Sequence, residues 1–256
     1  CPGHFGHIEL AKPVYHIGFL NKIKKILECV CVSCGKLKVD LSDPKLREVV
    51  SHLKNPKKRF AAVHALARVS SSLLTERFHT LLDTDDASYR PKWCVKPQKP
   101  SKHDGCGHKQ PVVRKEGLQL FLVYAKVAED AEGEPDKKAP KTLDKVPIPA
   151  SAALIIFRKM QLDEIRLMGL SVDEARPEWM VLTCLPVPPP PVRPSVAMDG
   201  GITRGEDDLT YKLAAIIRTN SALRRLEGEG APMHVLSDLE MVLQYHIATY
   251  MDNEIA

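Results

Sequence analysis

The clearest periodic pattern of apolar residues lies near the C-terminal end of the chain. Apolar side chains recur every three or four positions in two segments, which start at Leu209 and at Leu236 and are separated by residues 228–232, rich in Gly with one Pro. This spacing places the apolar residues of each segment on one face of a helix. Two such helices with a short break between them predict an antiparallel helical hairpin.

Two polar residues interrupt the apolar stripes of this hairpin. Asn220 lies in the first stripe, where we interpret it as a residue that sets the register between the helices. His246 lies in the second stripe, where a packed interhelical side chain is the favoured interpretation over a catalytic group. The outward faces carry Arg218, Arg224 and Arg225, which suit contact with a partner protein or simply with water.

Helical periodicity also appears before the hairpin. Three segments show it, at residues 14–28, 44–54 and 59–82. A fourth segment, residues 151–169, predicts a helix that begins with Ser151 as its N-cap and stops at Gly169.

The remaining patterns predict strands and connections. Two β-prone runs predict a β-hairpin over residues 112–127. The apolar run 179–185, bounded by prolines, predicts a buried strand in which Cys184 is a core thiol. The proline-rich residues 185–194 exclude a helix or a central strand, and we expect an extended internal strap, with a ligand for an aromatic groove as the alternative. A Gly-rich polar loop follows at residues 199–208.

Charge is distributed unequally along the 256 residues. The whole chain carries 37 Lys and Arg against 32 Asp and Glu, a net charge of +5. Residues 1–115 carry 22 basic and 10 acidic residues, a net charge of +12, and the rest carries a net charge of −7. Such asymmetry indicates a polyanionic partner for the basic half. The candidate nucleic-acid contacts lie in its two basic clusters, Lys57, Lys58, Arg59, Lys92 and Lys96.

The cysteines indicate metal binding. There are seven, and the informative unit is Cys31-Val-Ser-Cys34-Gly35, a turn that presents two thiolates on one side. A redox pair is the alternative, although no βαβ pattern surrounds it. Cys94 and Cys106 complete a predicted structural zinc site of four thiolates. Other residues are alternative zinc ligands: Cys29 could replace Cys31, and His103 and His108 could compete with the cysteines for the metal.

A second metal motif stands at the start of the sequence. Cys1-Pro-Gly-His4 supplies two ligands, which is half of a tetrahedral zinc site. We expect the other two ligands to precede this segment of the protein. No apolar run approaches the roughly 20 residues of a membrane-spanning helix. No common phosphate-loop, dinucleotide, metalloprotease or hydrolase motif occurs, and we expect no catalytic residue in this segment.

These patterns predict an α+β fold, with mixed helices and short antiparallel strands, structural zinc, and an antiparallel helical hairpin at the end. We expect three units. Residues 1–115 form a basic zinc-bearing segment. Residues 116–195 hold the β-hairpin, a helix and the proline strap, and residues 196–256 hold the Gly-rich loop and the helical hairpin.

Several strings together resemble the family of the largest subunits of eukaryotic RNA polymerase II, in the N-terminal clamp. The matching strings are CPGHFGHIELAKP at 1–13, CVCVSCGK at 29–36, ARPEWM at 175–180, LPVPPPPVRP at 185–194, RGEDDLTYKL at 204–213 and HIATYMDN at 246–253. They are long, unusual and spread over nearly the whole chain, which makes the resemblance specific.

The resemblance implies a role for each matched segment. Cys1 and His4 match half of the first zinc site, and Cys31, Cys34, Cys94 and Cys106 match the second. Residues 199–208 match the lid, with Asp199, Gly200, Gly201 and Arg204, a loop implied to separate transcript from template. Residues 209–252 match the clamp coiled-coil, which docks initiation factors and a NusG-like elongation factor in the family. The clamp closes over DNA and the DNA–RNA hybrid.

The resemblance also implies the setting of the chain. It places the chain in the nucleus among other polymerase subunits, in a nucleotidyltransferase whose catalytic Asp-rich loop and Mg²⁺ lie beyond Ala256. The nearest alternative is the equivalent segment of a polymerase I or III large subunit. From a different class, a free-standing zinc-bearing adaptor that binds a protein partner through the hairpin is also compatible with the sequence.

Overall fold

The computed structural model describes residues 2–71, 108, 110–125, 143–198, 200 and 203–255. Its strands are β1 (Gly6–Tyr15), β2 (Val112–Glu116), β3 (Gln119–Ala125), β4 (Leu143–Ile148), β5 (Val181–Val187), β6 (Val196–Met198) and β7 (Thr203–Gly205). Its α-helices are α1 (Leu20–Cys29), α2 (Pro44–His52), α3 (Pro56–Ser71), α4 (Ala150–Arg158), α5 (Leu162–Leu167), α6 (Asp208–Gly228) and α7 (Met233–Met251). Short 3-10 turns are η1 (Ile17–Phe19), η2 (Pro177–Met180), η3 (Pro190–Val192) and η5 (Asn253–Ile255).

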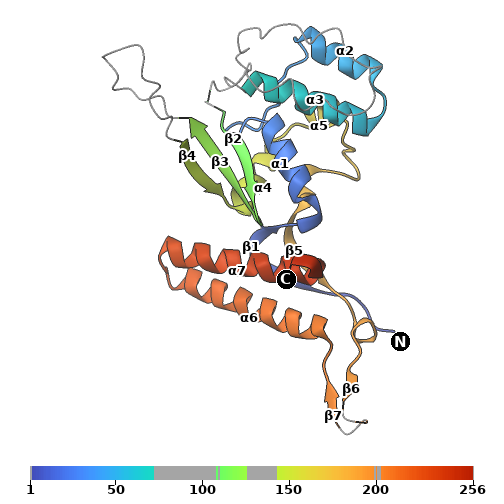
Figure 1. The fold of residues 1–256 in the computed structure, drawn as a ribbon, viewed down its shortest axis with the longest axis vertical. Coiled ribbons are helices and arrows are strands. Elements are labelled where there is room, and N and C mark those ends of the chain that lie inside the picture. Colours follow the sequence, from blue (N-terminus) through green and yellow to red (C-terminus); the bar gives the residue numbers. More distant parts are fainter. Residues whose placement is uncertain are drawn as a thin grey trace.

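These elements form a mixed α+β fold with two lobes, which confirms the predicted class. Helices α1 to α5 and the antiparallel sheet β2–β3–β4 form one lobe, and helices α6 and α7 lie side by side below it (Figure 1). The antiparallel pair β1–β5 connects the two, and the ribbon β6–β7 projects from the far end. No helix in the described residues is long and apolar enough to cross a membrane.

Each lobe has its own hydrophobic cluster. The larger cluster is built around Ile23 and Ile26 of α1, Val63 of α3 and Leu120 of β3, all fully buried. The smaller cluster joins the helical hairpin to the β1–β5 pair. Its buried members are Val14, Leu185, Leu213, Ile216, Leu223, Leu236, Leu243 and Ile247.

Local polar contacts fix where the helices begin. The Asp43 carboxylate accepts a hydrogen bond from the Lys45 N–H at 2.9 Å, with Pro44 in the first turn of α2. The Asp207 carboxylate accepts from the Leu209 N–H at 3.2 Å at the start of α6. Each carboxylate satisfies a backbone donor that has no partner inside the helix.

The prediction of one helix over residues 14–28 is wrong at its N-terminal end. Val14 and Tyr15 belong to β1, where they pair with Leu182 and Val181 of β5. Helix α1 begins only at Leu20, after the turn η1. The apolar pattern predicted one helix because it does not show which core each residue enters. Val14 lies in the smaller cluster, and the buried apolar residues of α1 lie in the larger one.

The segment 151–169 contains two helices instead of one. Helix α4 is preceded by Pro149, and Ser151 lies inside its first turn and not at the N-cap. The chain then turns through residues 159–161 because Met160 is buried in the larger cluster, and α5 follows. Gly169 does stop the second helix, and its φ of +77° is a conformation that glycine adopts easily.

The strand predicted over residues 179–185 is shifted and less buried than expected. Residues 177–180 form the turn η2, and β5 continues to Val187. Cys184 is exposed on β5, opposite Glu9, so the prediction of a core thiol is wrong. The proline strap therefore begins within a two-stranded ribbon, where a proline costs no central ladder bond, and continues into η3.

Other predictions match more closely. The β-hairpin predicted over residues 112–127 is β2–β3, and residues 44–54 contain α2. Helix α3 covers the start of the predicted segment 59–82, whose end lies outside the described residues. Strand β4 was not predicted, and residues 203–205 of the expected loop instead pair with β6.

Candidate zinc knuckle, basic surface and helical hairpin

The two cysteines of the Cys-x-x-Cys motif lie on one tight turn after α1. The Cys31 N–H donates to the Lys36 carbonyl at 2.8 Å, and the Gly35 N–H donates back to the Cys31 carbonyl at 2.9 Å. Gly35 has a φ of +76°, which favours glycine. An isolated bridge between Val30 and Leu37 closes the turn. The local geometry thus places Cys31 and Cys34 on one short loop, as zinc knuckles require.

This knuckle rests against the end of α4. A Cβ added at Gly35 would lie 2.7 Å from the Lys159 Cβ and 3.0 Å from the Ile156 carbonyl oxygen. The Lys159 ammonium donates to the Ser33 carbonyl at 3.0 Å. Glycine at position 35 therefore serves two purposes: it allows the turn and it lets the turn approach α4 closely.

Gln110, which we did not predict as a site residue, connects the knuckle to the segment that follows Cys106. Its carboxamide nitrogen lies 3.1 Å from the Cys31 sulfur and donates to the His108 carbonyl at 2.8 Å. Its carboxamide oxygen accepts from the Val32 N–H at 3.3 Å. Gln110 follows Cys106 by four positions, so the Cα atoms of the two residues are at most roughly 14 Å apart. In the sequence, the single sign of this contact is that a Gln follows the predicted ligand Cys106 within a few positions.

The remaining predicted zinc ligands are not all placed. Cys1, Cys94 and Cys106 lie outside the described residues, as does His103, and the four-thiolate site stays a prediction. Within the described ranges, no three His, Cys, Asp or Glu side chains gather in a metal-binding group. The pair of thiols on a tight turn fits one half of a structural zinc site, because such sites take thiolates in Cys-x-x-Cys spacing.

Geometry favours Cys31 over Cys29 as a ligand. Cys29 ends α1 inside the larger hydrophobic cluster, and burial raises the pKa of its thiol to about 12. Cys31 is equally buried but stands outside that cluster, as the first residue of the turn and beside the Gln110 carboxamide. His108, the other described competitor, is exposed.

The first predicted half-site lies at the start of β1. His4 is exposed two residues before β1 begins, and Gly3 has a φ of +84°. A Cβ at Gly3 would lie 2.8 Å from the Pro189 Cβ, so this turn rests on the proline strap.

The described basic candidates divide into two kinds. Lys57 and Lys58 are exposed on the first turn of α3. Arg59 is half-buried, with its guanidinium donating to the Leu53 carbonyl at 2.8 Å and the Val50 carbonyl at 3.4 Å. It therefore satisfies carbonyls at the end of α2. Lys92 and Lys96 lie outside the described residues.

The structure adds Lys22 to this surface. Its ammonium lies 3.4 Å from the centroid of the ring of Phe60, which is three residues after Lys57 in α3. The periodicity of α1 showed Lys22 on a polar face but could not show which helix that face meets.

Part of the predicted lid belongs to the β6–β7 ribbon, since residues 203–205 form β7. Gly200 has a φ of +71°, Arg204 is exposed on β7 opposite Ala197, and Asp199 and Gly201 lie outside the described residues. At the base of the ribbon, the Arg193 guanidinium donates to the Thr210 hydroxyl at 3.2 Å.

The predicted helical hairpin is confirmed as α6 and α7, but its polar residues act differently from what the pattern indicated. Asn220 is buried and bonds to the backbone of β1 instead of setting the register against α7. All three arginines are exposed, but the Arg224 guanidinium also contacts β1, where it donates to the Glu9 carbonyl at 2.8 Å. The three arginines therefore do not form one uniform surface.

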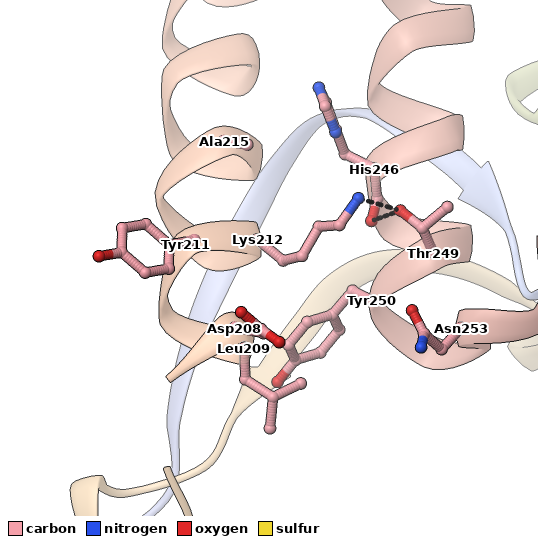
Figure 2. A pocket seen from close by; sticks show the side chains of 9 residues that line it. All are labelled: Asp208, Leu209, Tyr211, Lys212, Ala215, His246, Thr249, Tyr250 and Asn253. Carbon is pink, nitrogen blue, oxygen red and sulfur yellow. Dashed lines mark hydrogen bonds between the residues drawn. The ribbon is translucent and has the colours of Figure 1, made fainter. Parts of the chain in front are cut away.

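A pocket of about 650 Å³ lies where α6 begins and α7 ends (Figure 2). The Lys212 ammonium donates to the Thr249 hydroxyl at 3.1 Å, and that hydroxyl donates to the His246 carbonyl at 3.1 Å. His246 is half-buried at the pocket wall, so the expected interhelical packing holds only in part. Burial, and then the Lys212 charge, lower the pKa of His246.

One comparison with known proteins identifies the chain. Residues 1–256 match the family model described as RNA polymerase Rpb1, domain 1.

Proposed function

The chain belongs to the RNA polymerase Rpb1 domain 1 family, and on this premise we propose that it is the clamp segment of a polymerase II largest subunit. It is part of the largest subunit of a multi-subunit RNA polymerase and works in transcription, with DNA and the other polymerase subunits as partners. The proposed finer role is to help hold template DNA and the DNA–RNA hybrid in the nucleus. The family match over residues 1–256 carries the assignment to an RNA polymerase largest subunit, and the strings at 185–194 and 204–213 support the narrower proposal of polymerase II.

The proposed clamp segment uses its charge for nucleic acid. The basic half of the sequence, with a net charge of +12, includes the exposed Lys57 and Lys58, and the Lys22 ammonium of α1 contacts the Phe60 ring of the same helix α3. Each Lys that meets a phosphate releases a counterion, which stabilises the complex at low salt. Of the candidate contacts, Arg59 is the least suited because its guanidinium already serves α2.

Structural zinc would be held by Cys31, Cys34, Cys94 and Cys106, with Cys1 and His4 contributing to a second site. The knuckle geometry and the return of Gln110 to Cys31 support the first set. The zinc would supply a fixed crosslink between residues 31–34 and the segment that ends before Gln110. No catalytic residue is proposed, and Mg²⁺ belongs to the catalytic loop of the parent enzyme.

Three units are proposed as functional segments: residues 1–115 for zinc and nucleic acid, 116–195 for the clamp core, and 196–256 for the lid and hairpin. The larger hydrophobic cluster joins side chains from the first two, so these two fold together. The lid would separate transcript from template, and the hairpin would dock initiation factors and a NusG-like elongation factor. The exposed Arg218 and Arg225 support a docking role for the hairpin.

The test is the salt dependence of binding to a DNA–RNA scaffold. In the assembled polymerase, the double variant Lys57→Glu and Lys58→Glu should weaken retention on the scaffold. Its slope of log affinity against log salt should fall by roughly 0.9 for each lost phosphate contact. Arg158→Glu, an exposed charge reversal on α4, is the matched control.

Equal slopes for the parent and the double variant would contradict the proposed contact. If the slope of log affinity against log salt is near zero for both the parent and the double variant, the adaptor alternative is favoured. Flanking sequence with a C-terminal heptapeptide repeat would distinguish polymerase II from the polymerase I and III alternatives.

A further inference from the structure

The helical hairpin meets the rest of the chain along the edge of β1 that faces away from β5. The β1–β5 pairing is interrupted between Glu9 and Val14, where four residues of β1 lie opposite one residue of β5. Backbone groups in the interrupted part, and those along the edge of β1 that faces away from β5, need partners other than β5. Two carboxamide side chains from the hairpin provide them, one from each helix.

Gln244 of α7 binds a single residue of β1 through both of its polar atoms. Its carboxamide oxygen accepts from the Tyr15 N–H at 2.7 Å, and its nitrogen donates to the Tyr15 carbonyl at 2.9 Å. An opposing residue in an antiparallel strand makes the same two bonds. Gln244 thus takes the place of a neighbouring strand at Tyr15.

Asn220 of α6 also makes two bonds to the backbone of β1, but to two residues nearer the start of the strand. Its oxygen accepts from the Ala11 N–H at 2.7 Å, and its nitrogen donates to the Glu9 carbonyl at 2.9 Å. Asn220 is 6% exposed, so water does not easily replace these bonds. The Arg224 guanidinium adds a second donor to the Glu9 carbonyl at 2.8 Å, and Lys12 pairs with Glu227 at the same edge.

We infer that Asn220 and Gln244 are positioning residues, which fix the direction in which the helical hairpin leaves the larger lobe. Apolar packing between the hairpin and β1 is not directional and tolerates small rotations. Bidentate bonds to fixed backbone atoms do not tolerate them. The two attachment points are four residues apart on an extended strand, roughly 13 Å, and two points so separated define an axis.

This arrangement also connects the hairpin to the N-terminal turn. Strand β1 begins at Gly6, directly after the turn that carries His4, and the carboxamides hold it from Glu9 to Tyr15. A change in hairpin direction would therefore act on that turn through one short strand. The inference rests on these contacts and on no assumption about zinc or factor docking.

The experiment compares the assembled polymerase with a double variant, Asn220→Leu and Gln244→Met, which removes all four bonds at nearly constant volume. Gln161→Met, the same change at an exposed position between α4 and α5, is the matched control. Hydrogen exchange at the Ala11 and Tyr15 amides should accelerate by roughly tenfold or more, with the amides inside α6 and α7 unchanged.

Hairpin direction is measured separately by the distance between two spin labels. They are introduced as unnatural amino acids at Lys58 on α3 and Glu229 at the hairpin turn, both exposed positions. The distance distribution should be narrow in the parent and in Gln161→Met, and shifted or clearly broader in the double variant. A loss of stability alone would not move this distribution while the helix amides stay protected.

An unchanged distribution in the double variant would overturn the inference, because apolar packing alone would then set the hairpin direction. If the double variant does not assemble, the single variants Asn220→Asp and Gln244→Glu decide the question. Each keeps the acceptor of the carboxamide and loses its donor. Broadening in either variant supports the inference, and parent-like distributions in both overturn it.

Discussion

The larger lobe and the helical hairpin are held by different kinds of contact. In the larger lobe, side chains from five helices and a sheet enclose one apolar cluster, and polar contacts such as that between His64 and Glu28 lie at its margin. In the hairpin, apolar side chains join α6 to α7, but carboxamides and a guanidinium bond to the backbone of β1.

The pKa of Glu28 illustrates the first kind of contact. Burial alone would raise it, but the hydrogen bond from His64 at 2.6 Å, together with Lys24, lowers it overall. Such a pair strengthens packing between α1 and α3 without deciding where the lobe points. The difference indicates that burial supplies most of the stability in both regions, while directed polar bonds decide how one region is oriented on the other.

The largest expected effect comes from removing the proposed zinc, which should change the larger lobe and leave the helical hairpin unchanged. In the assembled polymerase, Cys34→Ser should lower the zinc content by one and accelerate amide exchange at residues 30–37 more than tenfold. The reason is that structural zinc contributes roughly 10–16 kcal/mol of apparent binding free energy in small sites. Metal analysis measures the zinc content, and hydrogen exchange measures the amides. The exchange rates of the amides of α6 and α7 should stay at the parent values.

The matched control for this change is Cys184→Ser, because Cys184 is exposed on β5 and remote from the knuckle in sequence. It should leave the zinc content at the parent value. An unchanged zinc content in Cys34→Ser would remove Cys34 from the proposed ligand set.

A smaller effect tests whether the two cores are independent. Ile26 and Leu243 are fully buried, one in each cluster, and replacing either with Ala should cost about 2–5 kcal/mol of local stability. Hydrogen exchange should show Ile26→Ala weakening α1, α3 and the sheet, and Leu243→Ala weakening α6 and α7. If either variant lowered protection from exchange equally in both lobes, the two lobes would form one cooperative unit, and the proposed independence of the two cores would be wrong.

The smallest effect on stability concerns the exposed arginines of the hairpin. Charge reversal at Arg218 and Arg225 should change stability by less than about 0.5 kcal/mol, because Arg218 donates to the Ala214 carbonyl and Arg225 pairs with Glu229, exposed contacts within α6 and its C-cap. Affinity of the polymerase for a NusG-like elongation factor should nevertheless fall, as measured by titration. Affinity equal to that of Arg158→Glu polymerase would argue against the hairpin as the docking surface.

Sequence pattern predicted those elements whose apolar residues all enter one core. The hairpin α6–α7, helix α2 and the β2–β3 pair are of this kind, and their patterns agree with their burial. The pattern failed at residues 14–28, where one apolar stripe serves two cores, and at Cys184, whose exposure depends on the irregular pairing of β1 with β5.

By itself, the sequence determined the α+β class, the knuckle turn around Gly35 and the unequal charge of the two halves, because each depends on residues close together in the chain or on composition alone. Only the tertiary structure showed that Arg59 faces inward, that Gln110 reaches Cys31, and that Asn220 and Gln244 bind β1. These contacts join residues as many as 229 positions apart. A side chain's periodicity shows which face it occupies, but the partner on that face is set by how distant segments pack.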